Sequence, residues 1–475
     1  MRIFFPASGN YNGTTLNNRG SNGNYWSSTY NSETNARNLN FNSSEVNPTN
    51  NNNRRNGFTV RAVQHSAHRN HLFFSSFFFF LFMTLSREHL LRLLYIAYYD
   101  ARRHKGKMSY VQRFDEKLKR NLDELCDELM TRRYHPLPSK CFIVFRPKQR
   151  EVFAAQFRDR VVHHLYYNMT HQMFERTFIA DTYSCIPGRG THYGVERMRD
   201  HMRRETLNWH APAYVMKLDI RGYFMHINRQ RLCDIATSSL QRMATHRVSK
   251  HIRETWADRT DMDLVLWLTR EIALLDPAPN CERIGGDADW QGLDPNKSLF
   301  TTTSGCGLPI GNLTSQLFSN VYLNEFDQYM KRTLGCKRYG RYVDDAYVVS
   351  ADREWLHSII PQARKFLQEH LGLDLHMGKL QITEVNRGVE FLGAFVKPYR
   401  TYVANQSLRR MHDSVKQIPL YDNDKAQRSI SSFLGVLMHA ATYNIRCKMF
   451  WRIKFLRVGI FNRNLTHFVS RKNIG

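Results

Sequence analysis

The feature that most constrains the fold is a pair of apolar segments that each carry aspartate at the end of a strand-like run. YVMKLDIRGYF (214–224) reaches Asp219, and RYVDDAYVVS (341–350) places Asp344 and Asp345 between two apolar halves. Side chains alternate along a strand, so a turn at the second site projects at least one carboxylate from the tip of a hairpin. One such aspartate alone is usually a turn or a helix cap. Two sites in one basic chain indicate a carboxylate cluster that serves metal chemistry.

The chain is also strongly basic. Its 475 residues include 68 Lys and Arg against 42 Asp and Glu, which gives a net charge of +26 and a pI near 9.9. Such a field concentrates polyanions, so nucleic acid is the first partner to expect, although charge alone leaves a ribosome-like or merely basic soluble protein open. Residues 1–82 contribute only seven arginines and two glutamates, so the charge belongs to the rest of the chain.

Cysteine spacing and hydropathy argue against two other classes of protein. None of the eight cysteines forms a C-x-x-C pair and no histidine pair has zinc-ligand spacing, so structural zinc is not expected. Scattered cysteines in a chain of this size indicate reduced thiols in a cytoplasmic protein. The apolar run from Phe77 to Met83 is far shorter than the roughly 20 residues of a membrane-spanning helix, so no membrane association is predicted.

Helical and strand-like patterns alternate with hairpin connections, so the expected class is α+β. The predicted helices lie at 86–133, after 162 to about 178, at 313–332, at 353–370 and over 406–470. The predicted strands lie in a hairpin within 141–162, at 213–219, in a hairpin at 338–350 and in a second hairpin near 388–404, with an irregular stretch at 276–304.

Residues 1–63 differ from everything that follows. They contain 17 asparagines, no lysine and only two acidic residues, Glu33 and Glu45. Their Gly, Ser and Asn content favours turns over helices, and the few aromatic residues support at most a minor core. A disordered or poorly ordered leader is therefore predicted, followed by a spacer at 64–82 that matches no structural template.

Carboxylates at strand ends suit magnesium-dependent nucleotidyl transfer. Two Mg²⁺ ions about 3.5–4 Å apart activate the attacking 3′ oxygen and stabilise the leaving pyrophosphate. Mg²⁺ usually takes one or two carboxylates together with phosphate oxygens and water. Asp219, Asp344 and Asp345 would supply such a set.

From about Met83 to the end, the sequence resembles reverse transcriptases of the group II intron-like superfamily. The segments that carry the resemblance are FRDRVV (157–162), SCIPGRGTH (184–192), DIRGYF (219–224), GLPIGNLTSQ (307–316), YVDD (342–345) and VEFLGA (389–394). The resemblance implies a right-hand polymerase with fingers, palm and a helical thumb. The implied division is 83–212 for N-terminal helices and fingers, 213–400 for the palm with an insertion at about 240–304, and 401–475 for the thumb.

The resemblance also implies roles for matching residues in a metal site. Asp219, Asp344 and the backbone carbonyl of Ile220 would hold two Mg²⁺ ions, and Asp345 would support them. Lys379, in LHMGKL, matches a palm lysine proposed to protonate the leaving pyrophosphate, with an ordinary surface lysine as the alternative.

Other matching residues would bind the nucleotide and the primer. The implied nucleotide-binding residues are Lys148, Arg150, Arg189, Phe224, Ile310 and Gly311, and the implied primer grip is Phe391, Leu392 and Gly393. Phe224 matches an aromatic steric gate, because a bulky ring leaves no room for a ribose 2′-OH; a core aromatic is the alternative. Arg150 offers a bidentate fork to a triphosphate, and Lys148 lies beside it; generic backbone-binding charge is the alternative for both.

Two departures from the usual pattern point to a subfamily. Most reverse transcriptases have Gln at the position of Ile310 and Pro at that of Gln316, whereas this pattern, with NKSLF (296–300), resembles the enzymes of diversity-generating retroelements. Those enzymes copy a template-repeat RNA into cDNA while misincorporating opposite adenines. Gln can hydrogen-bond to the incoming nucleotide whereas Ile only packs, so we expect Ile310 to contribute to low fidelity.

The leader resembles the variable end of the C-type-lectin-like proteins that such elements diversify. Asparagine codons are rich in adenine, as an adenine-mutable template repeat requires. We therefore predict that residues 1–63 are a template repeat read in frame and that initiation occurs at or near Met83. A genuine fusion of a lectin-like binding module to the polymerase is the competing interpretation.

Several alternatives stay open on the sequence. A group II intron, retron or phage-defence reverse transcriptase is the nearest alternative, and a non-catalytic nucleic-acid-binding protein with a polymerase fold is an alternative of a different class. The expected partners are template RNA, the primer–cDNA duplex, dNTPs and, by resemblance, a small basic helical accessory variability protein. The expected location is cytoplasmic, and the protein bacterial, archaeal or phage-encoded.

Overall fold

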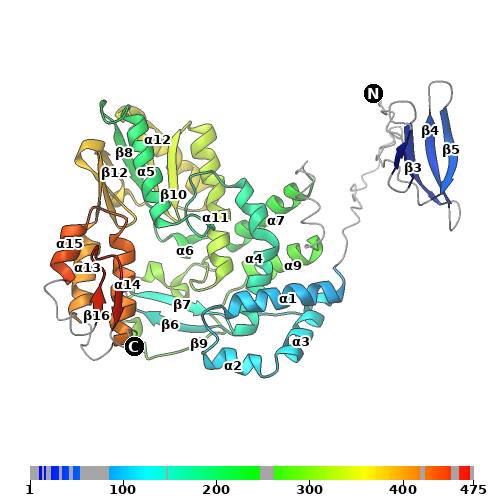
Figure 1. Cartoon of the computed structure of the whole chain (residues 1–475), viewed down its shortest axis with the longest axis horizontal. Helices are drawn as coiled ribbons and strands as arrows, with labels where there is room; N and C mark the ends of the chain where they lie inside the picture. Colours follow the sequence, from blue (N-terminus) through cyan, green and yellow to red (C-terminus); the bar gives the residue numbers. More distant parts are fainter. Residues whose placement is uncertain are drawn as a thin grey trace. The chain divides into compact units, whose positions relative to one another are not determined.

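A computed structural model of the chain divides into two units, Met1–Phe80 and Leu81–Gly475 (Figure 1). The structure describes residues 10–12, 15–17, 23–30, 35–41, 46–53, 85–145, 148–245, 261–417, 423–450 and 459–470. The predicted spacer at 64–82 and the predicted start near Met83 lie outside these ranges.

The described residues of the first unit are all strand. Two small antiparallel sheets are formed, one by β1 (Asn10–Asn12) and β2 (Thr15–Asn17), the other by β3 (Gly23–Tyr30), β4 (Asn35–Phe41) and β5 (Val46–Asn53) in that order. The lack of helix in this described part agrees with the Gly, Ser and Asn content, which disfavours helices.

The second unit begins with helices that pack on a long central one. These helices are α1 (Arg87–Arg102), α2 (Ser109–Asp115), α3 (Leu118–Met130) and the central α4 (Phe157–Thr177). The hydroxyl of Ser86 accepts a hydrogen bond from the backbone N–H of His89 and starts α1. Leu90, Leu94 and Ala97 then form a buried stripe at helical spacing. The helices predicted over 86–133 are confirmed, and so is a helix that ends near 178, although α4 begins at Phe157, within the span predicted to be a hairpin.

A hairpin of β6 (Lys140–Val144) and β7 (Arg150–Ala154) lies between α3 and α4, as predicted. The short strand β9 (Glu282–Arg283) adds to β6 in parallel. The irregular stretch around β9 contains α10 (Asp287–Trp290) and two 3₁₀ turns, η1 (Pro295–Lys297) and η2 (Leu299–Thr301). Residues 246–260 of the predicted insertion lie outside the described ranges.

The central sheet is antiparallel, with strand order β10-β11-β8-β12. Its strands are β10 (Arg338–Tyr342), β11 (Asp345–Ser350), β8 (Tyr214–Leu218) and β12 (Gln381–Glu384). The strands predicted at 213–219 and 338–350 are confirmed, whereas β12 was not predicted. Four residues of mixed polarity give little local signal, and β12 forms through pairing with the distant β8.

Alternating side chains of the central sheet enter two different cores. Met216 and Val348 face the main core, while Val215 and Tyr347 face the other side. The helices on the main-core side are α4, α7 (Arg229–Thr245), α9 (Met262–Ala273), α11 (Leu313–Gln328) and α12 (Arg353–Phe366). The helix α5 (Thr191–Glu205) covers the opposite side together with a second sheet of β13 (Val389–Phe391), β14 (Ala394–Lys397) and β15 (Arg400–Val403).

Two predicted helices end in π-helical turns, and three other short elements connect the sheet to its neighbours. The π-helical turns are η3 (Tyr329–Thr333), after α11, and η4 (Leu367–Leu371), after α12. The other connections are α6 (Tyr223–His226), η5 (Met377–Lys379) and η6 (Val385–Arg387).

The last part of the chain, drawn orange to red in Figure 1, has a small core of its own. Its helices are α13 (Asn405–Lys416), α14 (Asn423–Leu437) and α15 (Tyr443–Phe450). The prediction of helix up to residue 470 was wrong, since β16 (Gly459–Phe461) and β17 (Phe468–Ser470) form a hairpin. The side chain of Asn462 closes its turn by accepting hydrogen bonds from the backbone N–H groups of Thr466 and His467. Residues 451–458 lie outside the described part.

Mixed helices and antiparallel hairpins confirm the α+β class. Within the described ranges, no helix has the length and apolar character needed to cross a bilayer.

Candidate active site

The turn between β10 and β11 carries Asp344. Tyr342 pairs with Asp345, so Val343 and Asp344 form a two-residue connection. Val343 has φ of 55°, a left-handed conformation that is uncommon for a β-branched residue and is favoured by two-residue hairpin turns. Asp344 therefore lies at the tip of the hairpin, as predicted, and Asp345 begins β11.

The register of the central sheet brings Asp219 to the same place. Ala346 pairs with Leu218 in the antiparallel β8–β11 ladder, so the next position sets Asp219 across from Asp345. Residues opposite each other in such a ladder have Cα atoms about 4.5–5.5 Å apart. Alternation places both side chains on the face that carries Lys217. The carboxylates of two neighbouring strands thus share one face and one end of the sheet.

The carboxylates perturb one another. The pKa of Asp345 is raised to about 6, chiefly by burial; the Lys217 ammonium, 3.9 Å from Asp345 Oδ1, opposes this shift, and the charges of Asp344 and Asp219 contribute to it. Burial also raises the pKa of Asp344, with the charge of Asp219 as the next cause, and Lys379 and Arg150 counteract it. Concentrated and poorly solvated negative charge of this kind favours the binding of a cation.

Lys379 joins the carboxylates from a separate loop. Its Nζ lies 2.7 Å from Asp219 Oδ2, and the backbone N–H of His376 donates to the carbonyl of Asp219. The loop before β12 is therefore fastened to the end of β8, and the ammonium group neutralises Asp219. Lys379 is brought together with the carboxylates.

The backbone of Ile220 has a suitable direction for a metal ligand. Ile220 forms an antiparallel bridge with Leu375, and the hydrogen bonds of that bridge are made by its neighbours, from Arg221 N to Asp374 O and from His376 N to Asp219 O. In such a pair the N–H and C=O of Ile220 point away from Leu375, toward the side of β8 where β11 lies.

These residues fit magnesium without forming a closed cage. No group of three His, Cys, Asp or Glu side chains in the described ranges is arranged as a ready metal site. Mg²⁺ commonly binds through one or two carboxylates, with phosphate and water completing the shell, so an open cluster of carboxylates and one directed carbonyl suits it.

Phe224 and Ile310 lie against the same small apolar cluster of Cys141, Phe153, Met225 and Leu299. Phe224 is half-buried in α6, and the ring of Tyr223 packs on it edge to face. The two residues that the sequence linked to nucleotide selection are therefore neighbours in one cluster.

The backbone conformation and the close packing at position 311 both require glycine. Its φ is 130°, and a Cβ at this position would lie 2.7 Å from the carbonyl oxygen of Phe153. The strand β7 therefore approaches the loop closely, and the backbone N–H of Phe153 donates to the carbonyl of Ile310.

A buried polar network supports the turn that carries Asp344. Arg341 and Asp327 are both fully buried and form a two-pronged ion pair with N···O distances of 2.7 and 2.6 Å. Arg341 Nη1 also donates to the carbonyl of Val343, and the backbone N–H of Val343 donates to the hydroxyl of Ser184. The sequence analysis missed these residues; an arginine inside an apolar strand next to the aspartates was the available signal.

The remaining predicted residues are distributed more widely. Arg150 is exposed at the start of β7, and its charge lowers the pKa of Asp344. Lys148 is exposed beside it. Arg189 donates to the carbonyl of Thr182 and so holds its own loop.

The three residues of the predicted primer grip differ in burial. Phe391 is fully buried and packs edge to face on Tyr347, so it supports the sheet. Leu392 and Gly393, with φ of 50° and 80°, form the half-buried two-residue turn between β13 and β14. Contact of these residues with a primer stays a prediction.

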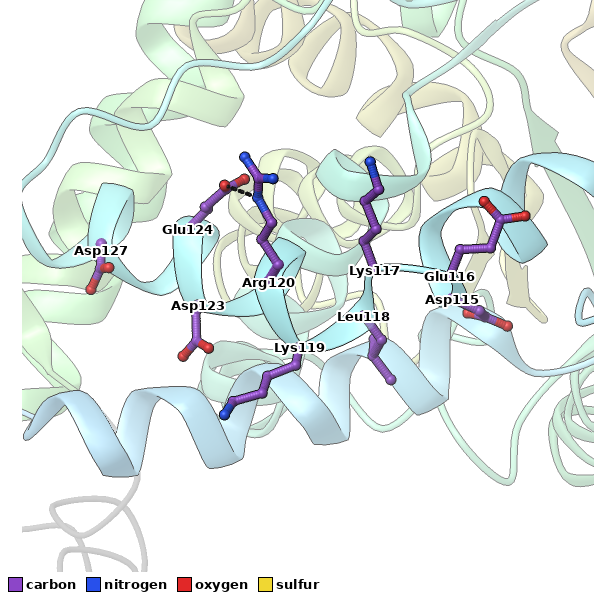
Figure 2. A pocket seen from close by; sticks show the side chains of 9 residues that line it. All are labelled: Asp115, Glu116, Lys117, Leu118, Lys119, Arg120, Asp123, Glu124 and Asp127. Carbon is purple, nitrogen blue, oxygen red and sulfur yellow. Dashed lines mark hydrogen bonds and ion pairs between the residues drawn. The ribbon is translucent and has the colours of Figure 1, made fainter.

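A separate hollow opens at the α2–α3 junction. Figure 2 shows that five acidic residues line it, Asp115, Glu116, Asp123, Glu124 and Asp127, together with Lys117, Lys119 and Arg120. Several of these carboxylates pair with arginines, such as Glu124 with Arg120. The lining is therefore of mixed charge, and none of the candidate site residues belongs to it.

An antiparallel sheet with clustered carboxylates, a hairpin on one side and a helical domain after it define a nucleic-acid polymerase of the right-hand class. Comparison with known families agrees. Residues 146–396, more than half of the chain, match the family model described as reverse transcriptase (RNA-dependent DNA polymerase). The chain belongs to the reverse transcriptase family.

Other comparisons give more distant similarity. Protein YkfC of Escherichia coli (strain K12) is 26% identical over 308 residues, which cover 57% of this chain and 70% of that protein. Telomerase from Candida albicans, solved with a TWJ fragment of telomeric RNA, aligns over 68% of this chain and 56% of its own, with 10% identity and a TM-score of 0.39. Apo telomerase from Candida tropicalis aligns over 71% and 66%, with 9% identity and a TM-score of 0.38. The chain spans less than two thirds of each of these telomerases.

Residues 1–63 match a separate family model, described as a domain of unknown function.

Proposed function

We propose that the protein copies RNA into DNA by two-metal nucleotidyl transfer at Asp219, Asp344 and Asp345. The observation that carries the proposal is the β8–β11 register, which sets Asp219 across from Asp345 with Asp344 at the adjoining turn. Bound Mg²⁺ would supply activation of the primer 3′ oxygen and neutralisation of the leaving pyrophosphate. Asp219, Asp344 and the carbonyl of Ile220 would hold the ions, and Asp345 would add to the local field.

Protein side chains would do the remaining work around that centre. Lys379, whose Nζ lies 2.7 Å from Asp219 Oδ2, would give a proton to the leaving pyrophosphate. Arg150 would contact the triphosphate, since its charge acts on Asp344. Phe224 would exclude a ribose 2′-OH.

Primer extension by the purified full chain tests this function. We expect Mg²⁺-dependent extension of a DNA primer on an RNA template, with strong preference for dNTPs. Extension on DNA templates only, or binding without extension, would overturn the proposal and favour a DNA-copying or non-catalytic protein.

We further propose that the enzyme belongs to a diversity-generating retroelement and mutates at template adenines. Ile310, which lies against the same cluster as Phe224, is apolar where a hydrogen-bonding Gln is usual. The loss of that hydrogen bond supports weaker discrimination between correctly paired and mispaired nucleotides. Replacing Ile310 with Gln should reduce errors opposite adenine in cDNA made on an adenine-rich template. Equal error frequencies in both proteins would contradict the role of Ile310.

The leader and the partners complete this proposal. Residues 1–63 would be a translated template repeat, and a small basic helical protein would assist the polymerase. The leader's resemblance to lectin-like variable regions supports the first part, and N-terminal sequencing of the native protein tests it. A start at Met1 would favour a genuine fusion instead.

A further inference from the structure

A buried carboxylate in β7 holds the segment that contains NKSLF. Glu151 is 1% exposed. Its Oε1 accepts a hydrogen bond from Leu299 N at 2.7 Å, and its Oε2 accepts from Ser298 Oγ and Trp290 Nε1, both at 2.9 Å. Hydrogen bonds to an ionised acceptor are stronger than neutral ones, and three of them fix a position more narrowly than apolar contact does.

The segment held in this way fits against two glycines that flank the nucleotide-facing residues. A Cβ on Gly307, at the start of GLPIG, would lie 2.4 Å from Leu299 Cδ2. A Cβ on Gly222, three residues after Asp219, would lie 3.4 Å from the carbonyl oxygen of Asn296. Both glycines have positive φ, 94° and 55°. The segment therefore packs tightly on Gly307, while at Gly222 the ring of His226 is the closest neighbour, at 2.7 Å, and the segment lies at an ordinary contact distance.

Leu299 also reaches the cluster behind the nucleotide-selecting residues. It belongs to the small core against which Phe224 and Ile310 pack. The backbone connects the same parts, since Leu308 N donates to Phe224 O and Phe153 N donates to Ile310 O, both at 2.8 Å. Removing Leu299 would leave space behind both side chains.

We propose that Glu151, Ser298 and Leu299 form a clasp that determines nucleotide specificity. They are positioning residues: by fixing the segment behind Phe224 and Ile310, they limit how far these two side chains can retreat from a ribose 2′-OH or a mispaired base. The clasp rests on the proposed polymerase function. It also gives a role to NKSLF, which the chemistry of the carboxylates does not use.

The test is single-nucleotide insertion by the full chain on a primed RNA template. Values of kcat and KM are measured for the matched dNTP, the matched rNTP and a mismatched dNTP. In Leu299→Ala and Glu151→Gln, we expect discrimination against rNTP and mismatched dNTP to fall about tenfold, while kcat for the matched dNTP changes less than about threefold. Glu282→Gln is the matched control, because Glu282 is exposed in the same irregular stretch and its carboxylate pairs with Lys140 at the surface.

A second readout separates positioning from folding. Hydrogen exchange of residues 287–302 should speed up in Glu151→Gln, while the thermal midpoint of the protein stays nearly unchanged. If Glu151→Gln does not fold, Ser298→Ala, which removes one of the three hydrogen bonds, replaces it in both measurements. Equal losses for all three nucleotides, or unchanged discrimination in folded variants, would overturn the clasp. A wild-type chain without DNA synthesis would instead overturn the polymerase function on which it rests.

Discussion

Asp345 differs from an ordinary carboxylate because it is partly buried beside two others. Burial raises its pKa to about 6, above the unfolded value of about 3.9. A carboxyl with a raised pKa favours the folded state while it is protonated. This stabilising contribution is complete below the unfolded pKa and is lost as the pH rises through about 6.

The resulting prediction concerns stability without metal. Between pH 5 and 7.5, the metal-free protein should lose stability relative to Asp345→Asn, and Mg²⁺ should restore it because the ion favours the carboxylate form. Urea unfolding at several pH values, with and without Mg²⁺, measures the difference. Parallel pH profiles for the two proteins would contradict the assignment of this shift to Asp345.

Phe224 provides a second prediction at this scale. Replacement by Ala should raise incorporation of rNTPs by about tenfold or more, since the missing ring leaves room for one extra oxygen. Phe224→Tyr keeps the ring and should keep the exclusion. Competition between dNTP and rNTP in primer extension measures the change, and unaltered selection in Phe224→Ala would show that the ring is only part of the core.

Residues whose side chains suit the proposed chemistry directly could be predicted from the sequence. Residues that only hold those side chains in place could not. The setting of Asp219, Asp344 and Asp345 at strand ends was visible in the sequence. The ion pair between Arg341 and Asp327 depends on how α11 packs against β10, and no local sequence pattern predicts it. The full burial of Phe391 was not predicted, because a core aromatic and an aromatic that contacts a ligand look alike in the sequence of a strand.

At the scale of elements, the β10–β11 hairpin depends on α11. Its strained Val343 is held by the Arg341–Asp327 pair from below. Breaking a buried ion pair from one side typically costs about 3–5 kcal/mol, because the remaining charge is left without compensation.

Asp327→Asn should therefore lower the free energy of unfolding by about 3–5 kcal/mol. The double variant Arg341→Met with Asp327→Leu should recover much of that stability but little of the DNA synthesis, because the carbonyl of Val343 has lost its donor. Urea unfolding and primer extension on the same preparations measure both effects. Full recovery of synthesis in the double variant would show that the network only stabilises the fold.

Elements with strong local patterns were predicted well. The amphipathic α1–α3 region and the β10–β11 hairpin follow from spacing and turn residues. The strand β12 and the β16–β17 hairpin were missed, because their pairing and the turn closed by Asn462 come from contacts that a basic helical pattern conceals.

At the scale of the whole molecule, the excess of basic residues and the proposed catalytic aspartates both lie after residues 1–82. A chain that starts at Met83 should keep its DNA synthesis and its binding of RNA. Its affinity should fall steeply with salt, by about a thousandfold between 50 and 200 mM if about six phosphates are contacted. Filter binding and primer extension compare it with the full chain. A large loss on removal of residues 1–82 would show that the leader is part of the enzyme.

The central claim is that Asp344 and Asp345 serve the chemistry of DNA synthesis. The most direct measurement is primer extension on RNA by Asp344→Ala with Asp345→Ala, beside the exposed control Glu354→Ala. Loss of the metal site should lower the rate about a thousandfold or more, with folding preserved and the control unaffected. Extension at the wild-type rate by the double variant would contradict the account.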